Sequence, residues 1–454
     1  MLERSEETPS VPSDGETVAT KLRRIATKAR SEPDFQFTSL FHLMNEWLLR
    51  QCFEQMRGDA ASGIDRMTKE RYAQDLDERL SDLLGRLHRM GYRPQAVRRV
   101  YIPKPGSAKQ RPLGIPTLED KLVQAGLVRI LEQIYEADFI DDSYGFRPGR
   151  GCHDALRALS HTVESGRVNW IVEADIKGFF DNVNHDWMIR FLNHRVNDKR
   201  VLRYVQRFLK AGVQEDGAIR TNETGTPQGG VISPLLANVY LHYALDLWFE
   251  RRFRQTCVGY ARLIRYADDF VVCFEQQQDA ERFREELTGR LAQFDLEVEP
   301  SKTKVLAFGP RATNEARRRG QRKPETFDFL GLTHYCGRSR DGRRFRMKRV
   351  TARKKFTAKL AEYQEWLQAN RSRLTNREMW ALTCAKLRGH YAYYGVTDNS
   401  RGLNRFTYEV QRLLFKWLNR KGGRRRMNWD AYNRMAERFP FPRPRIRVNL
   451  LPVW

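Results

Sequence analysis

Two adjacent carboxylates between two apolar runs limit the fold of this chain more than any other feature. Asp268 and Asp269 stand between Arg262-Leu263-Ile264-Arg265 and Phe270-Val271-Val272-Cys273-Phe274. Both runs are rich in β-branched and aromatic residues, which predicts two strands joined by a hairpin with the acidic pair at its tip. Neighbouring carboxylates repel each other unless cations hold them, although an Asp pair in a turn is more often only a solvated cap.

A third carboxylate, Asp175, ends another strand-like run over residues 170–176. If this strand and the hairpin are neighbours in one sheet, the three acidic side chains meet at its edge. Three carboxylates there suit two Mg²⁺ ions about 3.5–4 Å apart, as in-line phosphoryl transfer requires, with Mn²⁺ as the alternative metal. The sequence therefore predicts Asp175, Asp268 and Asp269 as the metal ligands and catalytic residues of a nucleic-acid polymerase.

The positive charge of the chain lies in its last third. The net charge is +25, and residues 311–454 carry the whole excess, with 36 Lys and Arg against 11 Asp and Glu. Such a segment repels itself without polyanionic counter-charge, although a charge run is usually only a solvated face. We therefore expect nucleic acid as the partner, bound mainly by this region, with Arg424, Arg425 and Arg426 contributing phosphate contacts.

Aromatic residues are interleaved with this basic charge. They are Trp366, Trp380, Tyr391, Tyr394, Trp417 and Trp429. We expect some of them to stack on bases, and most of the tryptophans to belong to the core of a helical region.

Other features exclude some classes of protein. No apolar run of about 18 residues is present, so no membrane insertion is expected. Residues 1–35 lack the order of a secretory signal and are predicted to be a flexible leader. The six cysteines are scattered without zinc-site spacing. These features favour a cytoplasmic protein, and we expect it to be bacterial and associated with nucleic acid.

The remaining pattern predicts an α+β fold, with helices packed on one face of a sheet. Helices are expected over 76–90, 117–135 and 279–294, and a long helical region over 187–211. Strands are expected over 97–103, 111–116 and 296–308, the last interrupted by Pro300-Ser301. A basic loop over 311–324 is predicted to separate this part from a helical, basic C-terminal region.

Four further residues are candidates for substrate binding. Lys104 and Arg111 flank a Pro/Gly hairpin, from which both can reach triphosphate oxygens, or remain solvated. Phe180 follows the Asp175 strand and could exclude a 2′-hydroxyl, or could be core like its neighbour. Gln228 precedes Gly229-Gly230, which allow close backbone approach to a nucleotide or template, or form only a turn.

Seven motifs together resemble the reverse transcriptases encoded by group II introns, over roughly residues 37–450. In chain order they are Arg111-Pro112-Leu113-Gly114-Ile115-Pro116, Tyr144-Gly145-Phe146-Arg147-Pro148, Ala174-Asp175-Ile176-Lys177-Gly178-Phe179-Phe180-Asp181, Thr226-Pro227-Gln228-Gly229-Gly230-Val231-Ile232-Ser233-Pro234, Tyr266-Ala267-Asp268-Asp269, Pro300-Ser301-Lys302-Thr303-Lys304 and Phe327-Asp328-Phe329-Leu330-Gly331. The run His390-Tyr391-Ala392-Tyr393-Tyr394-Gly395 is similar to the aromatic motif of the family's maturase region.

The resemblance implies a right-hand polymerase. An N-terminal extension and fingers would occupy 36–165, a palm with an antiparallel sheet 166–310, and an α-helical thumb or maturase region 311–454. The implied partners are an RNA template, a DNA primer, deoxynucleoside triphosphates and intron RNA. The implied roles are Mg²⁺ ligation by Asp175, Asp268 and Asp269, sugar selection by Phe180, a place near the nucleotide for Gln228, and triphosphate binding by Lys104 and Arg111.

Many relatives continue into a Cys/His-bearing endonuclease, whereas this sequence stops at Trp454, so it resembles the branch that lacks one. Three other functions remain open at this stage. A similar polymerase could serve antiviral defence or DNA repair. The chain could also be a splicing factor without polymerase activity, which the three intact Asp residues disfavour, or an RNA-dependent RNA polymerase, which Phe180 disfavours.

Overall fold

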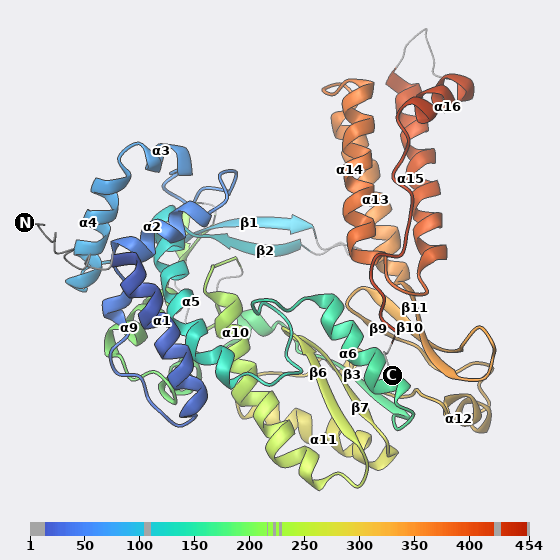
Figure 1. The fold of residues 1–454 in the computed structure, drawn as a ribbon, viewed down its shortest axis with the longest axis horizontal. Coiled ribbons are helices and arrows are strands. Elements are labelled where there is room, and N and C mark those ends of the chain that lie inside the picture. The colour runs from blue at the N-terminus through green and yellow to red at the C-terminus, as the bar shows by residue number, and fades with distance from the viewer. Residues whose placement is uncertain are drawn as a thin grey trace, which may run out of the picture.

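A computed structural model of the chain describes residues 14–103, 110–215, 217–220, 224–226, 229–421 and 428–451. Helices and three sheets alternate over these residues, so the fold is mixed α+β with a helical C-terminal region (Figure 1). In this part of the chain no helix has both the length and the apolar character needed to cross a membrane.

The central sheet is antiparallel throughout, and its strands run in the order β6-β7-β3-β8. They are β6 (Ala261–Tyr266), β7 (Asp269–Phe274), β3 (Trp170–Asp175) and β8 (Lys304–Ala307). The predicted hairpin and its pairing with the third strand are confirmed. The interruption predicted at Pro300-Ser301 is confirmed as the 3₁₀ turn η5 (Pro300–Lys302), and only the part after it, β8, is a named strand.

Both faces of this sheet are covered, so the expectation of helices on one face is wrong. Along β7, Phe270, Val272 and Phe274 belong to one apolar core, while Val271 and Cys273 belong to a second. Alternate side chains of a strand point to opposite faces, so the two cores lie on opposite sides of the sheet. An uninterrupted apolar run such as β7 is typical of a strand that is buried on both sides.

Helices from the middle of the chain pack in the first core. They are α7 (Phe179–Asn182), α8 (His185–Asn193), α9 (Lys199–Leu209), α10 (Ser233–Leu241) and α11 (Gln277–Ala292), with the π-helical turns η2 (His242–Asp246) and η3 (Phe249–Phe253) and the 3₁₀ turn η4 (Arg254–Thr256). The helical region expected over 187–211 is confirmed, and it consists of two helices, α8 and α9. Asp198 starts a new helix by accepting hydrogen bonds from the N–H groups of Arg200 and Val201.

The N-terminal segment is also helical. Its elements are α1 (Asp14–Ser31), η1 (Phe41–Leu43), α2 (Glu46–Gln55), α3 (Lys69–Ala73), α4 (Leu76–His88) and α5 (Leu118–Asp138). The flexible leader predicted for residues 1–35 is therefore wrong for 14–31, and residues 1–13 lie outside the described part. Arg195 holds the end of α1, since its guanidinium binds the carbonyls of Ala29 and Glu32 and pairs with Asp138 at 3.0 Å.

A second sheet projects from the N-terminal half in the order β2-β1-β4-β5 (Figure 1). Its strands are β1 (Val97–Pro103), β2 (Gln110–Ile115), β4 (Val213–Glu215) and β5 (Ala218–Arg220). The predicted hairpin of β1 and β2 is confirmed, with Ile102 paired to Arg111.

The C-terminal region begins with strands, which the sequence analysis did not predict. The elements are α12 (Ala312–Arg318), β9 (Phe327–Phe329), β10 (Leu332–Arg338), β11 (Phe345–Thr351), α13 (Arg353–Asn370), α14 (Asn376–Tyr394), α15 (Ser400–Lys421) and α16 (Trp429–Arg438). The basic loop expected over 311–324 is also wrong, because it contains α12.

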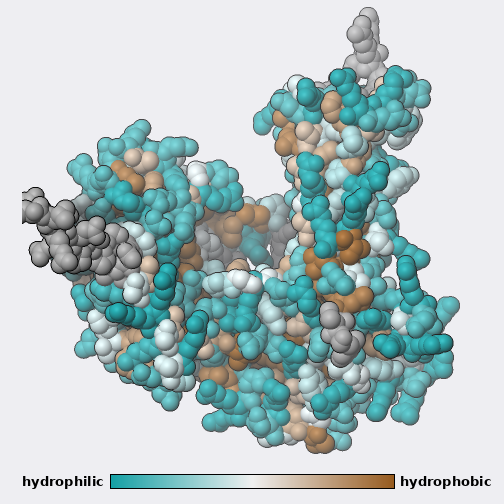
Figure 2. Space-filling view, viewed as in Figure 1, coloured by the Kyte–Doolittle hydropathy of each residue, from teal (hydrophilic) through white to brown (hydrophobic). Residues whose placement is uncertain are grey.

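Helix α6 (Cys152–Glu164) connects the central sheet to the C-terminal region. Arg346 pairs with Glu164, and the fully buried Arg349 donates to Ser160 Oγ at 2.8 Å. The second core contains residues of the central sheet, of α6 and of the C-terminal helices. The C-terminal region is therefore docked on the sheet, and Figure 2 shows the surface hollowed between it and the N-terminal half.

Candidate active site

The register of the central sheet brings the predicted carboxylates together. Asp175, the last residue of β3, lies directly opposite Asp269, the first residue of β7. Asp268 precedes it in the turn that joins β6 to β7. Directly opposite residues of an antiparallel pair have Cβ atoms about 4.5–5.5 Å apart, so the three side chains share one edge of the sheet.

The turn that carries the acidic pair is held in an uncommon backbone conformation. Ala267 has a φ of +56°, a region that non-glycine residues populate sparsely. Gly145 packs beneath it, since a Cβ at Gly145 would lie 2.3 Å from the Ala267 nitrogen. The motif Tyr144-Gly145-Phe146-Arg147-Pro148 thus supports the turn, and a larger side chain at Gly145 would displace it.

A fully buried ion pair fixes the same turn. Arg265 and Asp246 have no exposed side-chain surface, and Arg265 Nε donates to Asp246 Oδ1 at 2.8 Å. Arg265 Nη1 also donates to Ala267 O at 2.9 Å and to Asn238 Oδ1 at 3.0 Å. The sequence analysis assigned no role to these residues. An arginine inside an apolar strand run was the available signal, because a buried charge needs a partner.

The carboxylates repel one another. Removal of water by the surrounding protein raises the pKa of Asp269 to about 7, and Asp268 and Asp175 add to this rise. Asp269 is exposed at the sheet edge, and a hydrogen bond from the Leu330 N–H opposes part of the pKa rise. Burial also raises the pKa of Asp268 above its ordinary value, and the positive charge of Arg111 offsets part of this rise. The arrangement favours a bound cation.

Lys302 is the cation that the described structure places at the site. Its ammonium pairs with Asp175 Oδ2, and this contact raises the pKa of Lys302. In the described part of the chain no three His, Cys, Asp or Glu side chains are gathered closely enough to enclose a metal ion. The sequence analysis quoted Pro300-Ser301-Lys302-Thr303-Lys304 as a motif but gave Lys302 no role.

Phe180 lies close to the glycine-rich loop. It is half-buried against the first core, whereas Phe179 is fully inside that core. The N–H of Thr226 donates to the Phe180 carbonyl at 2.8 Å, and a Cβ at Gly225 would meet the same carbonyl at 2.9 Å. The Phe180 turn and the start of this loop therefore pack against each other.

The other end of the loop meets the β1–β2 hairpin. Gly229 has a φ of +110°, and a Cβ there would lie 2.7 Å from the Gly114 carbonyl of β2. Arg111, on the same strand, is exposed and acts electrostatically on Asp268. The structure thus brings Arg111 near Asp268 and places Phe180 against the glycine-rich loop, while Lys104 and Gln228 lie outside the described residues.

A family model for reverse transcriptases, described as RNA-dependent DNA polymerases, matches residues 102–334. This span includes the three carboxylates, Phe180 and Arg111, and it covers more than half of the chain. The chain therefore belongs to the reverse transcriptase family.

Within this family, similarity points to proteins encoded by group II introns. Group II intron-encoded protein LtrA of Lactococcus lactis subsp. cremoris is 29% identical over 475 aligned positions, which cover 88% of this chain and 77% of LtrA. Protein YkfC of Escherichia coli K12 is 34% identical over 317, covering 62% of this chain and 83% of YkfC. Nuclear intron maturase 1 of Arabidopsis thaliana is 34% identical over 95, covering 21% of this chain and 13% of the maturase.

Proposed function

We propose that Asp175, Asp268 and Asp269 hold two divalent cations, Mg²⁺ or Mn²⁺, at which the chain copies RNA into DNA. The observation that carries this proposal is the register of Asp175 against Asp269. Carboxylate oxygens are the ligands that hard cations prefer. Burial is the main cause of the raised pKa of Asp269, and the negative charges of Asp268 and Asp175 add to it, a repulsion that cations would relieve. Bound cations would align the attacking 3′-hydroxyl with the leaving pyrophosphate.

The remaining site residues would orient the substrates. The guanidinium of Arg111, on β2, would donate paired hydrogen bonds to triphosphate oxygens, and Lys104 would bind beside it. Phe180 would lie against the sugar of an incoming deoxynucleotide, and Gln228 near the same nucleotide. Lys302 would neutralise Asp175 when no cation is bound and move to other anionic oxygens when one is.

The proposed architecture is a right hand. The β2-β1-β4-β5 sheet and the helices around it would be the fingers, over residues 36–165 together with β4 and β5. The central sheet would be the palm, over 166–310, and 311–454 would be a thumb that also grips intron RNA. The excess charge of 25 over 311–454 supports the last assignment, as do the intron-encoded relatives.

Asp268→Asn and Asp175→Asn test the catalytic site. Each should slow primer extension on an RNA template at least about 100-fold, because a neutral amide cannot balance divalent cations and the lost stabilisation amounts to several kcal/mol. RNA affinity should be kept. Asp186→Asn, an exposed carboxylate in the first turn of α8, is the matched control. Near-normal extension by the folded Asp175 and Asp268 variants would remove these residues from the site.

A further inference from the structure

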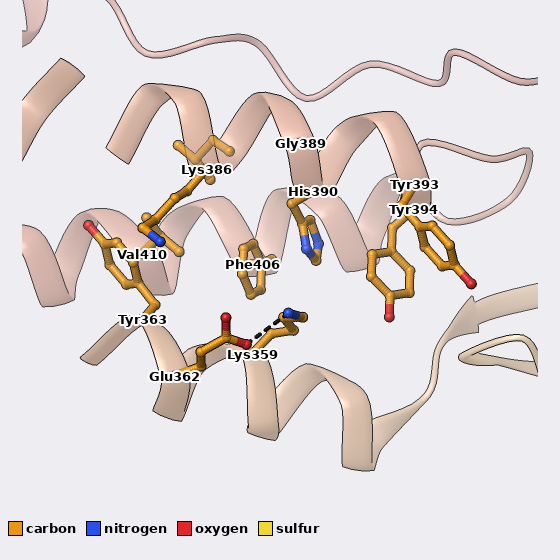
Figure 3. Close-up of a pocket in the computed structure, with 11 residues that line it drawn as sticks. Lys359, Glu362, Tyr363, Lys386, Gly389, His390, Tyr393, Tyr394, Phe406 and Val410 are labelled. Carbon is orange, nitrogen blue, oxygen red and sulfur yellow. Dashed lines mark hydrogen bonds and ion pairs between the residues drawn. The ribbon is translucent and has the colours of Figure 1, made fainter. Parts of the chain in front are cut away.

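Helices α13, α14 and α15 enclose a cavity that takes no part in the site above. Its volume is about 430 Å³, within the ~300–1,000 Å³ typical of small-ligand sites. Five aromatic rings contribute to its walls, as Figure 3 shows. They are Tyr363, His390, Tyr393, Tyr394 and Phe406.

These rings offer flat surfaces rather than polar groups. His390 and Phe406 are stacked with ring centroids 3.7 Å apart and planes 8° from parallel. The Tyr363 hydroxyl bonds to Thr383 Oγ1 at 2.8 Å, and the Tyr393 hydroxyl donates to the Leu330 carbonyl at 3.0 Å. His390 is buried, its Nε2 has no hydrogen-bond partner among the described residues, and burial lowers its pKa to about 4. The walls are thus aromatic and uncharged.

The rim of the cavity is charged. Lys359 and Lys386 line it, and both are exposed. Lys359 also pairs with the exposed Glu362 at 2.8 Å, as the dashed line in Figure 3 marks. Two ammonium groups beside an aromatic wall suit a ligand that has a flat ring and a phosphate.

A glycine lines the cavity. Gly389 lines it from the interior of α14, where glycine is less favourable than any other residue except proline. A Cβ built at Gly389 meets no atom within 4 Å, so protein packing does not require glycine at this position. A ligand that fills the cavity would require it, because any side chain would project into the ligand's space.

We propose that this cavity binds one unstacked base of an RNA held by the C-terminal region, with the adjoining phosphate at Lys359 and Lys386. The inference rests on the proposed function, which places RNA on this region. Single-stranded RNA is recognised through bases that stack on aromatic side chains and phosphates that meet basic ones. A partner that used only charge would not need the aromatic walls, and an apolar partner would not need the lysines.

Gly389→Leu tests the proposal by filling the cavity in the full chain. Gly289→Leu is the matched control, since Gly289 is also an exposed helix-interior glycine with open space around its Cβ, but lies on α11. The probes are a fluorescein-labelled single-stranded oligoadenylate and an abasic ribose-phosphate oligomer of the same length. They carry the same phosphates and differ in their bases.

Gly389→Leu should bind the oligoadenylate about tenfold more weakly, the equivalent of ~1.4 kcal/mol of base stacking. It should bind the abasic oligomer as the parent does, with the same salt dependence, because no phosphate contact is lost. Gly289→Leu should match the parent on both probes. Unchanged affinity for the oligoadenylate, or an equal loss on both probes, would overturn the base site.

Two further measurements separate the causes of failure. The thermal unfolding temperature of Gly389→Leu should equal or exceed that of the parent. If it is lower, Gly389→Gln replaces it in the binding experiment and is judged by the same criteria. If the parent extends a primer and binds RNA, and Gly389→Leu binds both probes as the parent does, only the base site is contradicted. Parent protein that binds neither probe contradicts RNA binding by the C-terminal region, and the base site with it.

Discussion

At the scale of single residues, Phe180 lies at the boundary between the first core and solvent. Its neighbour Phe179 is buried, and the two rings meet edge to face at 5.3 Å. Phe180 itself is only half-buried against the first core. Phe179 is therefore a core residue, whereas the role of Phe180 in sugar selection stays a prediction.

Phe180→Val should admit ribonucleotides while keeping most deoxynucleotide use. The smaller side chain makes room for a 2′-hydroxyl, and steric discrimination of this kind is worth roughly 10–200-fold. The measurement is the ratio of kcat/KM for a deoxynucleotide to that for its ribonucleotide, with Phe179→Leu as the control. If the ratio stays at the parental value, Phe180 is a core residue and does not select the sugar of the nucleotide.

At the scale of elements, a buried network connects η2 and α10 to the β6–β7 turn. Asp246 lies in η2, Asn238 lies in α10, and Arg265 in β6 joins both to the carbonyl of Ala267. Asn238 Nδ2 also donates to the Gly145 carbonyl at 2.7 Å. The position of the acidic pair thus depends on packing behind the sheet as well as on the turn itself.

Asp246→Asn should lower the free energy of unfolding by about 3–5 kcal/mol, because it leaves the Arg265 charge buried without a counter-charge. Urea denaturation measures this loss. Asp82→Asn removes one partner of an exposed pair with Arg86 and should cost less than about 1 kcal/mol.

The double variant Asp246→Leu with Arg265→Met separates stability from positioning. Replacing both charges should restore much of the stability but not the hydrogen bond to Ala267, so primer extension should remain slow. Full DNA synthesis by the double variant would show that the network serves only folding.

Sequence patterns predicted elements well where one local signal dominates. The alternating and continuous apolar runs gave β1, β3, β6 and β7, and the strong periodicity of 117–135 gave α5. Errors arose where distant contacts decide. Asp198 caps α9, and its second oxygen accepts the N–H groups of Leu40 and Phe41, 158 and 157 positions away, so the start of this helix depends on distant partners. The strands β9–β11 are short or polar, and their buried side comes from packing against β7, α6 and α15.

The site residues divide in the same way. Asp175, Asp268 and Asp269 follow from strand patterns, since register is fixed once both faces of the sheet must be apolar. Arg265, Asp246 and Lys302 could not be assigned from local patterns, because their roles depend on partners that the sequence places far away. The interleaved aromatics also divide: Trp380, Trp417, Tyr391 and Tyr394 are buried, whereas Trp429 is 54% exposed.

At the scale of the whole molecule, charge and catalysis are separated along the chain. Changing Arg424, Arg425 and Arg426, which lie outside the described residues, to Gln should weaken RNA binding and reduce its salt dependence. Each lost contact with a single-stranded phosphate lowers the slope of log K against log [salt] by ~0.7. Extension of an annealed primer at saturating template should continue.

The control for that experiment is a variant that loses three positive charges on α1 instead. Lys21, Arg23 and Arg24 are exposed and lie outside the basic third, so changing them to Gln should leave the slope closer to the parental value. If both triple variants behave alike, RNA affinity depends on total charge rather than on the C-terminal region.

The second core has a consequence for synthesis of the chain on the ribosome. One face of the central sheet is covered by residues such as Tyr391 and Leu414, and Leu450 belongs to the same core. Chains fold from the N-terminus as they emerge, but residues up to Leu450, made long after the strands themselves, complete the cover that α6 begins on this face. A product of premature termination after the catalytic strands would therefore carry all three carboxylates and still present a large apolar surface, which favours aggregation and removal by quality control over activity.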